Sequence, residues 1–331
     1  MVKKIFNITL KPKENIIKSI KVASFADGTP ISLLVRVIKG TNEGPTLSML
    51  GVQHGDEYNG MEIINRFMEQ LEPQDISGTV IGIPVSNPLA FNAAGRMAPE
   101  SMGWEELNMN RIWPGNPRGL LTERIVASIW KNVITESNCI LDFHEGGKCY
   151  LARYIWVPHN DDTDKIVGNQ VEKIYGFFGQ GIPVNAKPHS MTSPMRGCLE
   201  IQAGLHNIPC IAPELGGGHR IWEELVQDGI NGARNVMIGL GMLQGEPVGQ
   251  EKKQLVATEA FSPRTLHGGI CYNSCELNAI VNKDATLGIV KDIAGREIEK
   301  IHAPYKSVLF DIRHQPIVHS GDWLYACGKI S

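Results

Sequence analysis

The chain has 331 residues, a formal net charge of -3 at pH 7, 42% hydrophobic residues and 20% charged residues. This balance is ordinary for a globular protein and provides no excess positive charge, so neither nucleic acid nor an anionic membrane is expected as a partner. Because single cores stop growing at roughly 250 to 300 residues, the length predicts one large domain and a smaller second one.

Two further properties concern the cellular location. No apolar run approaches the roughly 18 residues that a membrane span needs, and the first residues lack the apolar segment and cleavage site of a signal peptide. We therefore expect a cytoplasmic protein. The seven cysteines form no C-x-x-C pair and lack the density of a small secreted scaffold, so reduced thiols are expected.

Residues 46–243 alternate short apolar runs with helical patterns, which is typical of a sheet covered by helices on both faces. The sequence therefore predicts an α/β sandwich. Its strands are predicted from runs of apolar and β-branched residues at residues 46–52, 79–85, 138–143 and 208–215.

The helices between these strands follow from spacing and capping signals. Apolar residues recur at helical spacing from Met61 to Leu71, and Thr122 is the predicted N-cap of a second helix, with Glu123 as an acid near its start. The glycines at residues 216–218 are expected to stop the last strand before a further helical pattern.

The pattern changes after about residue 250, where a polar segment, Q-E-K-K-Q, precedes short strand-like runs. Turn residues recur at the roughly 8 to 12 residue spacing of a small barrel or sandwich. They lie at residues 283–284, 294–295, 303–304 and 320–322. We predict a catalytic α/β domain at residues 1–255 and a β-rich domain at residues 256–331.

A histidine and a carboxylate stand three residues apart in the segment G-V-Q-H-G-D-E at residues 51–57. Side chains at this spacing share a helix face, so His54 and Glu57 can act together. His144 follows a predicted strand, at the carboxyl edge where open α/β sheets bind ligands. Two histidines and one glutamate match a catalytic zinc with one open position, although H-x-x-E alone is often accidental.

Five motifs in a fixed order resemble those of the succinylglutamate desuccinylase/aspartoacylase family, relatives of the zinc carboxypeptidases. They are H-G-D-E, N-P-x-A with an arginine eight residues after the proline, L-N-x-N-R-x-x-P-G, D-x-H-x-G-G and P-E-L, spread over residues 46–216. Five ordered motifs are far more specific than any one of them. The resemblance implies a zinc-carboxypeptidase-like α/β/α sandwich with a mixed sheet, and the β-rich tail resembles the C-terminal domain of the family.

The resemblance also implies roles for individual residues. One zinc ion per chain would be held by His54, Glu57 and His144, and zinc both activates water and polarises a carbonyl. Glu214, in P-E-L, matches the general base of the family, although a strand-end acid is otherwise more often a cap. Arg96 would stabilise the negatively charged oxygen of the tetrahedral intermediate.

Asn110 and Arg111 would grip a substrate carboxylate, since guanidinium and carboxylate can pair through two parallel hydrogen bonds. Without the motif, both arginines would be interpreted as solvated surface charges. Two positions depart from the family pattern: Asn108 stands where an acid is common, and Glu145 stands where a small residue is common. His219 follows the glycine run and could border the pocket.

These observations favour a zinc-dependent deacylase that hydrolyses a small, carboxylate-bearing N-acyl amino acid. A diaminobutyrate-type N-acetyl substrate fits the resemblance. A carboxypeptidase for short peptides would use the same groups and stays open. So does a non-catalytic zinc-binding or carrier module, although no M-K-M or D-K-A hairpin surrounds Lys306. The sequence leaves the oligomeric state open, a homo-oligomer included.

Overall fold

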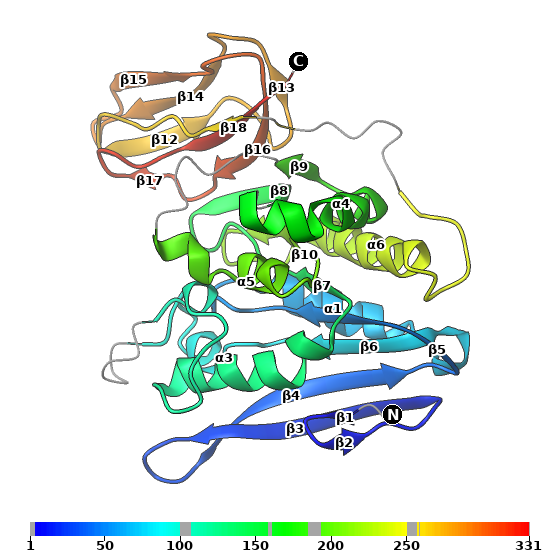
Figure 1. Cartoon of the computed structure of the whole chain (residues 1–331). Helices are drawn as coiled ribbons and strands as arrows, with labels where there is room; N and C mark the ends of the chain where they lie inside the picture. The colour runs from blue at the N-terminus through cyan, green and yellow to red at the C-terminus, as the bar shows by residue number, and fades with distance from the viewer. Residues whose placement is uncertain are drawn as a thin grey trace.

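The computed structural model describes residues 4–99, 107–157, 161–184, 193–249, 257 and 259–330. Within these residues, twelve strands form one mixed sheet (Figure 1). They are β3 (Glu14–Ser24), β4 (Pro30–Lys39), β5 (Asn42–Leu50), β6 (Ser77–Ile83), β7 (Cys139–Asp142), β8 (Tyr150–Trp156), β9 (Ile182–Val184), β10 (Cys210–Gly217), β11 (Ala260–Phe261), β13 (Ile280–Val281), β16 (Ser307–Arg313) and β18 (Tyr325–Lys329).

The spatial order of the strands is β11-β18-β16-β8-β10-β7-β5-β6-β4-β3, with β13 beside β16 and β9 beside β8. The pairs β6–β5, β5–β7 and β7–β10 are parallel. The pairs β3–β4, β4–β6, β10–β8, β8–β16 and β16–β18 are antiparallel. The mixed sheet is confirmed, and each of the four predicted strands is present. The sequence prediction did not include the hairpin β3–β4 or the strand β8.

Helices cover both faces of this sheet, as predicted. The helices are α1 (Asn59–Glu69), α2 (Pro88–Asn92), α3 (Leu121–Asn132), α4 (Asp161–Phe178), α5 (Leu199–Leu205) and α6 (Glu223–Gly239), with 3-10 turns η1 (Pro73–Asp75), η3 (Met109–Arg111), η4 (Ile134–Glu136) and η5 (Ser193–Gly197). Alternate residues of β7 enter different cores: Cys139 and Leu141 pack with α1, α4 and α6, while Ile140 packs with α3 and α5. A strand buried on both faces reads as a continuous apolar run.

One local prediction is wrong. Helix α3 begins at Leu121, so its N-cap residue is Leu120, and Thr122 lies buried in the first turn. The Glu123 carboxylate instead accepts a hydrogen bond from the Leu120 amide at 2.8 Å, which satisfies a free N–H at the helix start. The glycine run does end β10, but at Gly217, two residues beyond the predicted end at Leu215, and a Cβ at Gly217 would lie 1.9 Å from the carbonyl oxygen of Tyr150. These glycines permit close approach of two strands.

The C-terminal residues form a separate antiparallel sheet and also extend the large one. The separate sheet has the order β15-β14-β12-β17 and contains β12 (Gly269–Asn273), β14 (Thr286–Lys291), β15 (Glu297–His302) and β17 (Ile317–Val318). All four predicted turns lie between strands. A small hairpin, β1 (Lys4–Ile5) with β2 (Ile8–Thr9), begins the described chain. The predicted domain boundary at residues 255 and 256 lies outside the described residues.

Two other expectations concern the whole described chain. All seven cysteines lie in it and are free thiols, five of them buried. No helix in the described ranges is both long and apolar enough to cross a membrane.

Pairing between β16 and β8 makes a clear prediction about the two proposed domains. Asp311, Ile312 and Arg313 of β16 pair with residues 150–152 of β8, so the tail covers an edge of the large sheet. Deleting residues 256–331 should expose that edge and cause aggregation, because an unpaired strand is a template for pairing with other chains. Size-exclusion chromatography beside the full-length protein checks this expectation. A monodisperse, folded fragment would show instead that residues 1–255 are an independent domain.

Candidate active site

The predicted metal ligands lie at the carboxyl ends of neighbouring parallel strands. His54 and Glu57 follow β5, and His144 follows β7. His144 also forms a bridge with Glu214 of β10: its amide donates to the Pro213 carbonyl at 2.9 Å, and the Leu215 amide donates to the His144 carbonyl at 2.8 Å. The order β5-β7-β10 therefore brings together residues far apart in the chain at the sheet edge where open α/β folds bind ligands.

The backbone before His54 has an unusual conformation. Val52 has a φ of 51°, in the left-handed region that a β-branched residue rarely adopts. At Gly55, a Cβ atom would lie 2.0 Å from the carbonyl of Ala90, so only glycine fits there. Strained or glycine-dependent backbone is common next to functional sites, because the surrounding fold holds it in place.

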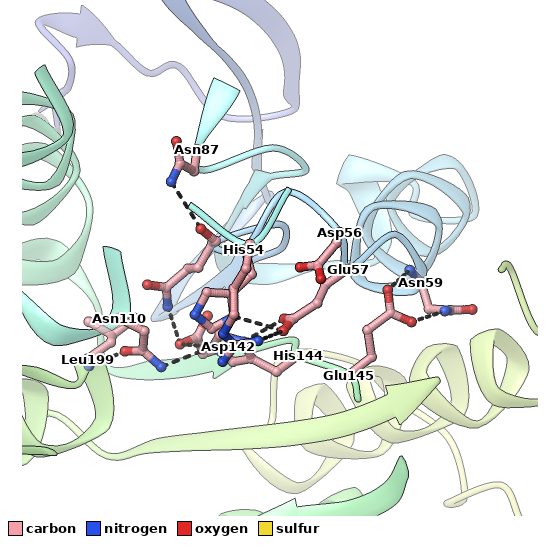
Figure 2. Close-up of polar contacts among 12 residues, drawn as sticks. His54, Asp56, Glu57, Asn59, Asn87, Asn110, Asp142, His144, Glu145 and Leu199 are labelled. Carbon is pink, nitrogen blue, oxygen red and sulfur yellow. Dashed lines mark hydrogen bonds and ion pairs between the residues drawn. The ribbon is translucent and has the colours of Figure 1, made fainter. Parts of the chain in front are cut away.

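Three donor atoms converge on one point. The Nδ1 atom of His54 lies 2.8 Å from Oε1 of Glu57, and the Nδ1 atom of His144 lies 2.8 Å from Oε2 of the same carboxylate (Figure 2). All three side chains are buried, and their candidate ligand atoms lie within 4.8 Å of one another. Two imidazole nitrogens and a carboxylate are the donor set of a catalytic zinc site with one open position.

The outer nitrogens of both imidazoles have hydrogen-bond partners of their own. His54 Nε2 lies 3.1 Å from Oδ1 of Asn108, and His144 Nε2 lies 3.1 Å from Oδ2 of Asp142. Gln53 donates to Asp142, so that carboxylate is itself oriented. Metal-binding histidines usually donate their second ring N–H to such an oxygen, which directs the other nitrogen toward the metal. The residues therefore fit a metal ion held through both Nδ1 atoms.

Asn108 supplies a neutral acceptor, and its contact with His54 gives a test. Asn108→Ala should lower metal affinity by about ten- to a hundred-fold, because loss of an outer-shell partner frees the imidazole to turn. Competition with a fluorescent chelator measures the affinity. Asn282→Ala, in an exposed turn, is the matched control. Unchanged affinity in Asn108→Ala would mean that packing alone orients His54.

Electrostatics within the cluster favour the metal-binding forms of two ligands. Burial lowers the pKa of His54, which keeps its imidazole neutral. Burial opposes ionisation of Glu57, but His54 and His144 hold the pKa of this carboxyl well below its usual range. Burial also opposes a charge on His144, yet Asp142 and Glu57 raise its pKa well above the ordinary value. A metal ion would replace the proton that these two carboxylates attract to His144.

Glu214 and Arg96 line the same cavity as the three ligands, and its volume is about 200 Å³. Arg96 donates from Nη1 to Oε1 of Glu57 at 3.0 Å, and about half of its side chain is exposed. Burial raises the pKa of Glu214 to about 8, an effect that the charge of His144 opposes. A metal ion beside His144 would oppose it further, because a nearby positive charge favours the carboxylate form.

Asn110 and Arg111 also line this cavity. The Asn110 amide lies 3.2 Å from His144 Nε2, and its oxygen accepts from the Leu199 amide at 2.9 Å, so this side chain holds the site together. Arg111 donates from Nη1 to the Asn110 carbonyl at 2.6 Å and to the Cys198 sulfur at 3.2 Å. In the described chain, the rest of its guanidinium has no hydrogen-bond partner. The predicted grip on a carboxylate therefore depends mainly on Arg111.

Several residues at the site were given no role by the sequence. Asp142 and Glu200 form a second acidic cluster around His144, and burial raises the pKa of Glu200 to about 7. Asp142 is the first residue of the D-x-H-x-G-G motif, so the sequence did contain a signal for it. Glu145 is buried and accepts hydrogen bonds from Asn59. His219, which the sequence placed at the border of the pocket, is not among the described residues that line this cavity, and its Nε2 lies 4.0 Å from Asp56 Oδ2.

Fold and site together define a class: an open α/β sheet with a His-Glu-His cluster at its carboxyl edge, typical of metal-dependent hydrolases. The chain belongs to the succinylglutamate desuccinylase/aspartoacylase family, whose catalytic-domain model matches residues 43–240. This is a family of deacylases, enzymes that hydrolyse amide bonds, and the resemblance inferred from the five motifs is thereby confirmed.

Individual relatives agree with this family. The chain is 29% identical, over 219 residues, to the N-alpha-acetyl-L-2,4-diaminobutyric acid deacetylase of Halomonas elongata, a match that covers 65% of this chain and 60% of that protein. A succinylglutamate desuccinylase from Silicibacter sp. TM1040 superposes with a TM-score of 0.83 at 21% identity, over 98% of both chains. The product-bound ectoine utilization protein of Ruegeria pomeroyi gives 0.82 at 24% identity, over 97% of both. These two structures establish a shared fold.

Proposed function

We propose that the protein is a zinc-dependent deacylase that hydrolyses the amide bond of a small N-acyl amino acid. The observation that carries this proposal is the convergence of His54, Glu57 and His144 in a cavity that Glu214 and Arg96 also line. The similarity to the diaminobutyric acid deacetylase of Halomonas elongata supports an N-acetyl diamino acid as substrate.

In the proposed mechanism, each residue contributes a separate step. A zinc ion bound to the three ligands would activate a water molecule and polarise the carbonyl of the amide. Glu214 accepts a proton from the attacking water and returns it to the leaving amine. Arg96 turns from Glu57 toward the carbonyl oxygen and stabilises its developing negative charge. Arg111 pairs with the substrate carboxylate and fixes the amide in the cavity.

The test is amine release from a panel of N-acetyl, N-succinyl and other N-acyl amino acids, beside short peptides. Chelation should abolish turnover of the preferred N-acyl amino acid, and added zinc should restore it. Because manganese or cobalt can also fill such a site, the metal content of each preparation should be measured in parallel. Cleavage of peptides in place of N-acyl amino acids would identify a carboxypeptidase. No turnover of any compound by zinc-loaded protein would contradict the deacylase proposal.

A further inference from the structure

A second cavity, of about 320 Å³, adjoins the one that holds the candidate ligands. The two share four lining residues, namely Arg96, Glu145, Tyr154 and Glu214. The C-terminal part of the chain contributes Asp311 and Trp323 to the second cavity. A substrate whose amide lies beside Glu214 would therefore extend into the second cavity, where another part of it would contact residues of the C-terminal part.

A β-bulge in strand β16 directs Asp311 into this cavity. Leu309 pairs with Cys327 of β18 and Asp311 pairs with the next residue, Ala326, so Phe310 is an extra residue. Because of this bulge, Leu309 and Ile312 both pack in the core of the C-terminal part, although they are three positions apart. Without the bulge, strand alternation would put Asp311 on the Leu309 face, inside that apolar core. The bulge thus keeps the Asp311 carboxylate out of the apolar core and places it at the cavity.

Among the described residues, the Asp311 carboxylate forms no salt bridge. Its residue is 6% exposed, and its Oδ1 atom has no hydrogen-bond partner in the described chain. Arg313, two residues along the strand, is already satisfied: it pairs with Asp322 at 3.2 Å and donates to the carbonyls of Gln315 and Ile317. Burial raises the pKa of Asp311 well above its usual range, and Glu214 raises it further. A cation in the cavity would favour the carboxylate form of Asp311.

A second carboxylate with an unpartnered oxygen lines the same cavity. Asp56, next to Glu57 in the chain (Figure 2), is 6% exposed. Its Oδ2 atom accepts from the Lys148 amide at 3.3 Å and lies 4.0 Å from His219 Nε2, but its Oδ1 atom has no partner in the described chain. A buried carboxylate oxygen without a partner costs free energy, so two of them at one cavity indicate a positively charged or strongly donating ligand.

The remaining lining residues are compatible with a cationic ligand. Four carboxylates line the cavity against two cationic side chains, Arg96 and Lys148. Arg96 is paired with Glu57, and Lys148 is exposed to solvent. Tyr150 and Trp323, which stack with ring centroids 3.6 Å apart, also line the cavity, and the Arg313 guanidinium already lies over the Tyr150 ring, 5.3 Å from its centroid.

We propose that Asp311 and Asp56 form a subsite for an ammonium group on the side chain of the substrate, so that the enzyme selects N-acyl derivatives of diamino acids. This inference rests on the proposed deacylase function. It assigns the C-terminal part of the chain a role in substrate selection, with Asp311 as the specificity-determining residue, and it leaves Arg111 to bind the carboxylate.

The test compares two substrates that differ in one amine, Nα-acetyl-2,4-diaminobutyrate and Nα-acetyl-2-aminobutyrate. Wild-type enzyme should prefer the first, and Asp311→Asn should lower kcat/KM for it by about ten- to a hundred-fold, the loss expected for a charge-assisted hydrogen bond. For the second substrate, kcat/KM should change less than about threefold, because uncharged contacts remain. Asp284→Asn, the same change in an exposed turn with a φ of 64°, is the control.

Equal losses for both substrates in Asp311→Asn would overturn the subsite and indicate a structural role. Calorimetric binding of free 2,4-diaminobutyrate and 2-aminobutyrate to the zinc-loaded protein separates this inference from the deacylase proposal. One outcome is that wild type turns over neither N-acetyl substrate but binds 2,4-diaminobutyrate more tightly than 2-aminobutyrate, and that Asp311→Asn loses this difference in affinity. The subsite would then stand while the deacylase proposal fails. If wild type binds both amino acids equally or binds neither, the ammonium subsite is wrong.

Discussion

Replacing Glu214 with Gln should lower kcat by roughly a thousand-fold while leaving the metal content unchanged, since general acid–base groups contribute about 10²- to 10⁴-fold. Glutamine keeps the size of the side chain and can still donate or accept hydrogen bonds, but it cannot take up a proton. Glu214 lines both cavities and is bridged through its backbone to His144, so it lies beside the candidate metal ligands and faces the space that a substrate would occupy. It is not one of the three converging ligands.

Two measurements make this result decisive. Zinc per chain, measured by mass spectrometry of the digested protein, should match wild type, which separates proton transfer from metal binding. Glu259→Gln, the same substitution at an exposed residue that pairs with Lys329, should retain full activity. A Glu214→Gln enzyme with more than about a tenth of the wild-type kcat would exclude Glu214 as the proton carrier.

The sequence predicted the convergence of His54, Glu57 and His144, because its signals are local. His54 and Glu57 lie in one short segment after β5, and His144 follows β7, which lies next to β5 in the sheet, so the topology of an open α/β sheet brings all three to the same edge. Asn108 was noted as a departure from the family pattern, and its oxygen does contact His54. Residues within or next to these motifs could therefore be placed before the structure was known.

Asp311 could not be predicted in this way. Its position depends on a one-residue bulge and on the pairing of β16 with β8, two strands about 150 residues apart in sequence. Local periodicity reports which face of a strand is buried, but not where an extra residue reverses the alternation. Strand β8 escaped prediction for a related reason: it is partly buried on both faces and shows no clean alternation. The predicted glycine stop after Glu214 is present, but β10 extends two residues into the run, because close strand packing also requires glycine.

Replacing His144 with Ala should remove both the metal and the activity. Loss of one of three protein ligands should weaken zinc binding by more than about a hundred-fold, since even changes to residues that only orient a ligand cost roughly ten- to a hundred-fold. The remaining pair, His54 and Glu57, would keep their contact at 2.8 Å, so the fold around β5 should persist. Zinc, manganese and cobalt per chain, measured after dialysis, should all fall below one tenth.

The control for this variant is His302→Ala, an exposed histidine of the C-terminal sheet whose Nδ1 atom contacts the Asp284 carbonyl at 3.0 Å. It should keep full metal content and activity. Thermal unfolding adds a second readout, because a metal that binds only the folded state stabilises it. Chelation should therefore lower the midpoint of wild type but leave that of His144→Ala unchanged. A His144→Ala protein that still carries one metal ion per chain would place the metal elsewhere, and the acidic cluster of Asp142 and Glu200 would become the next candidate.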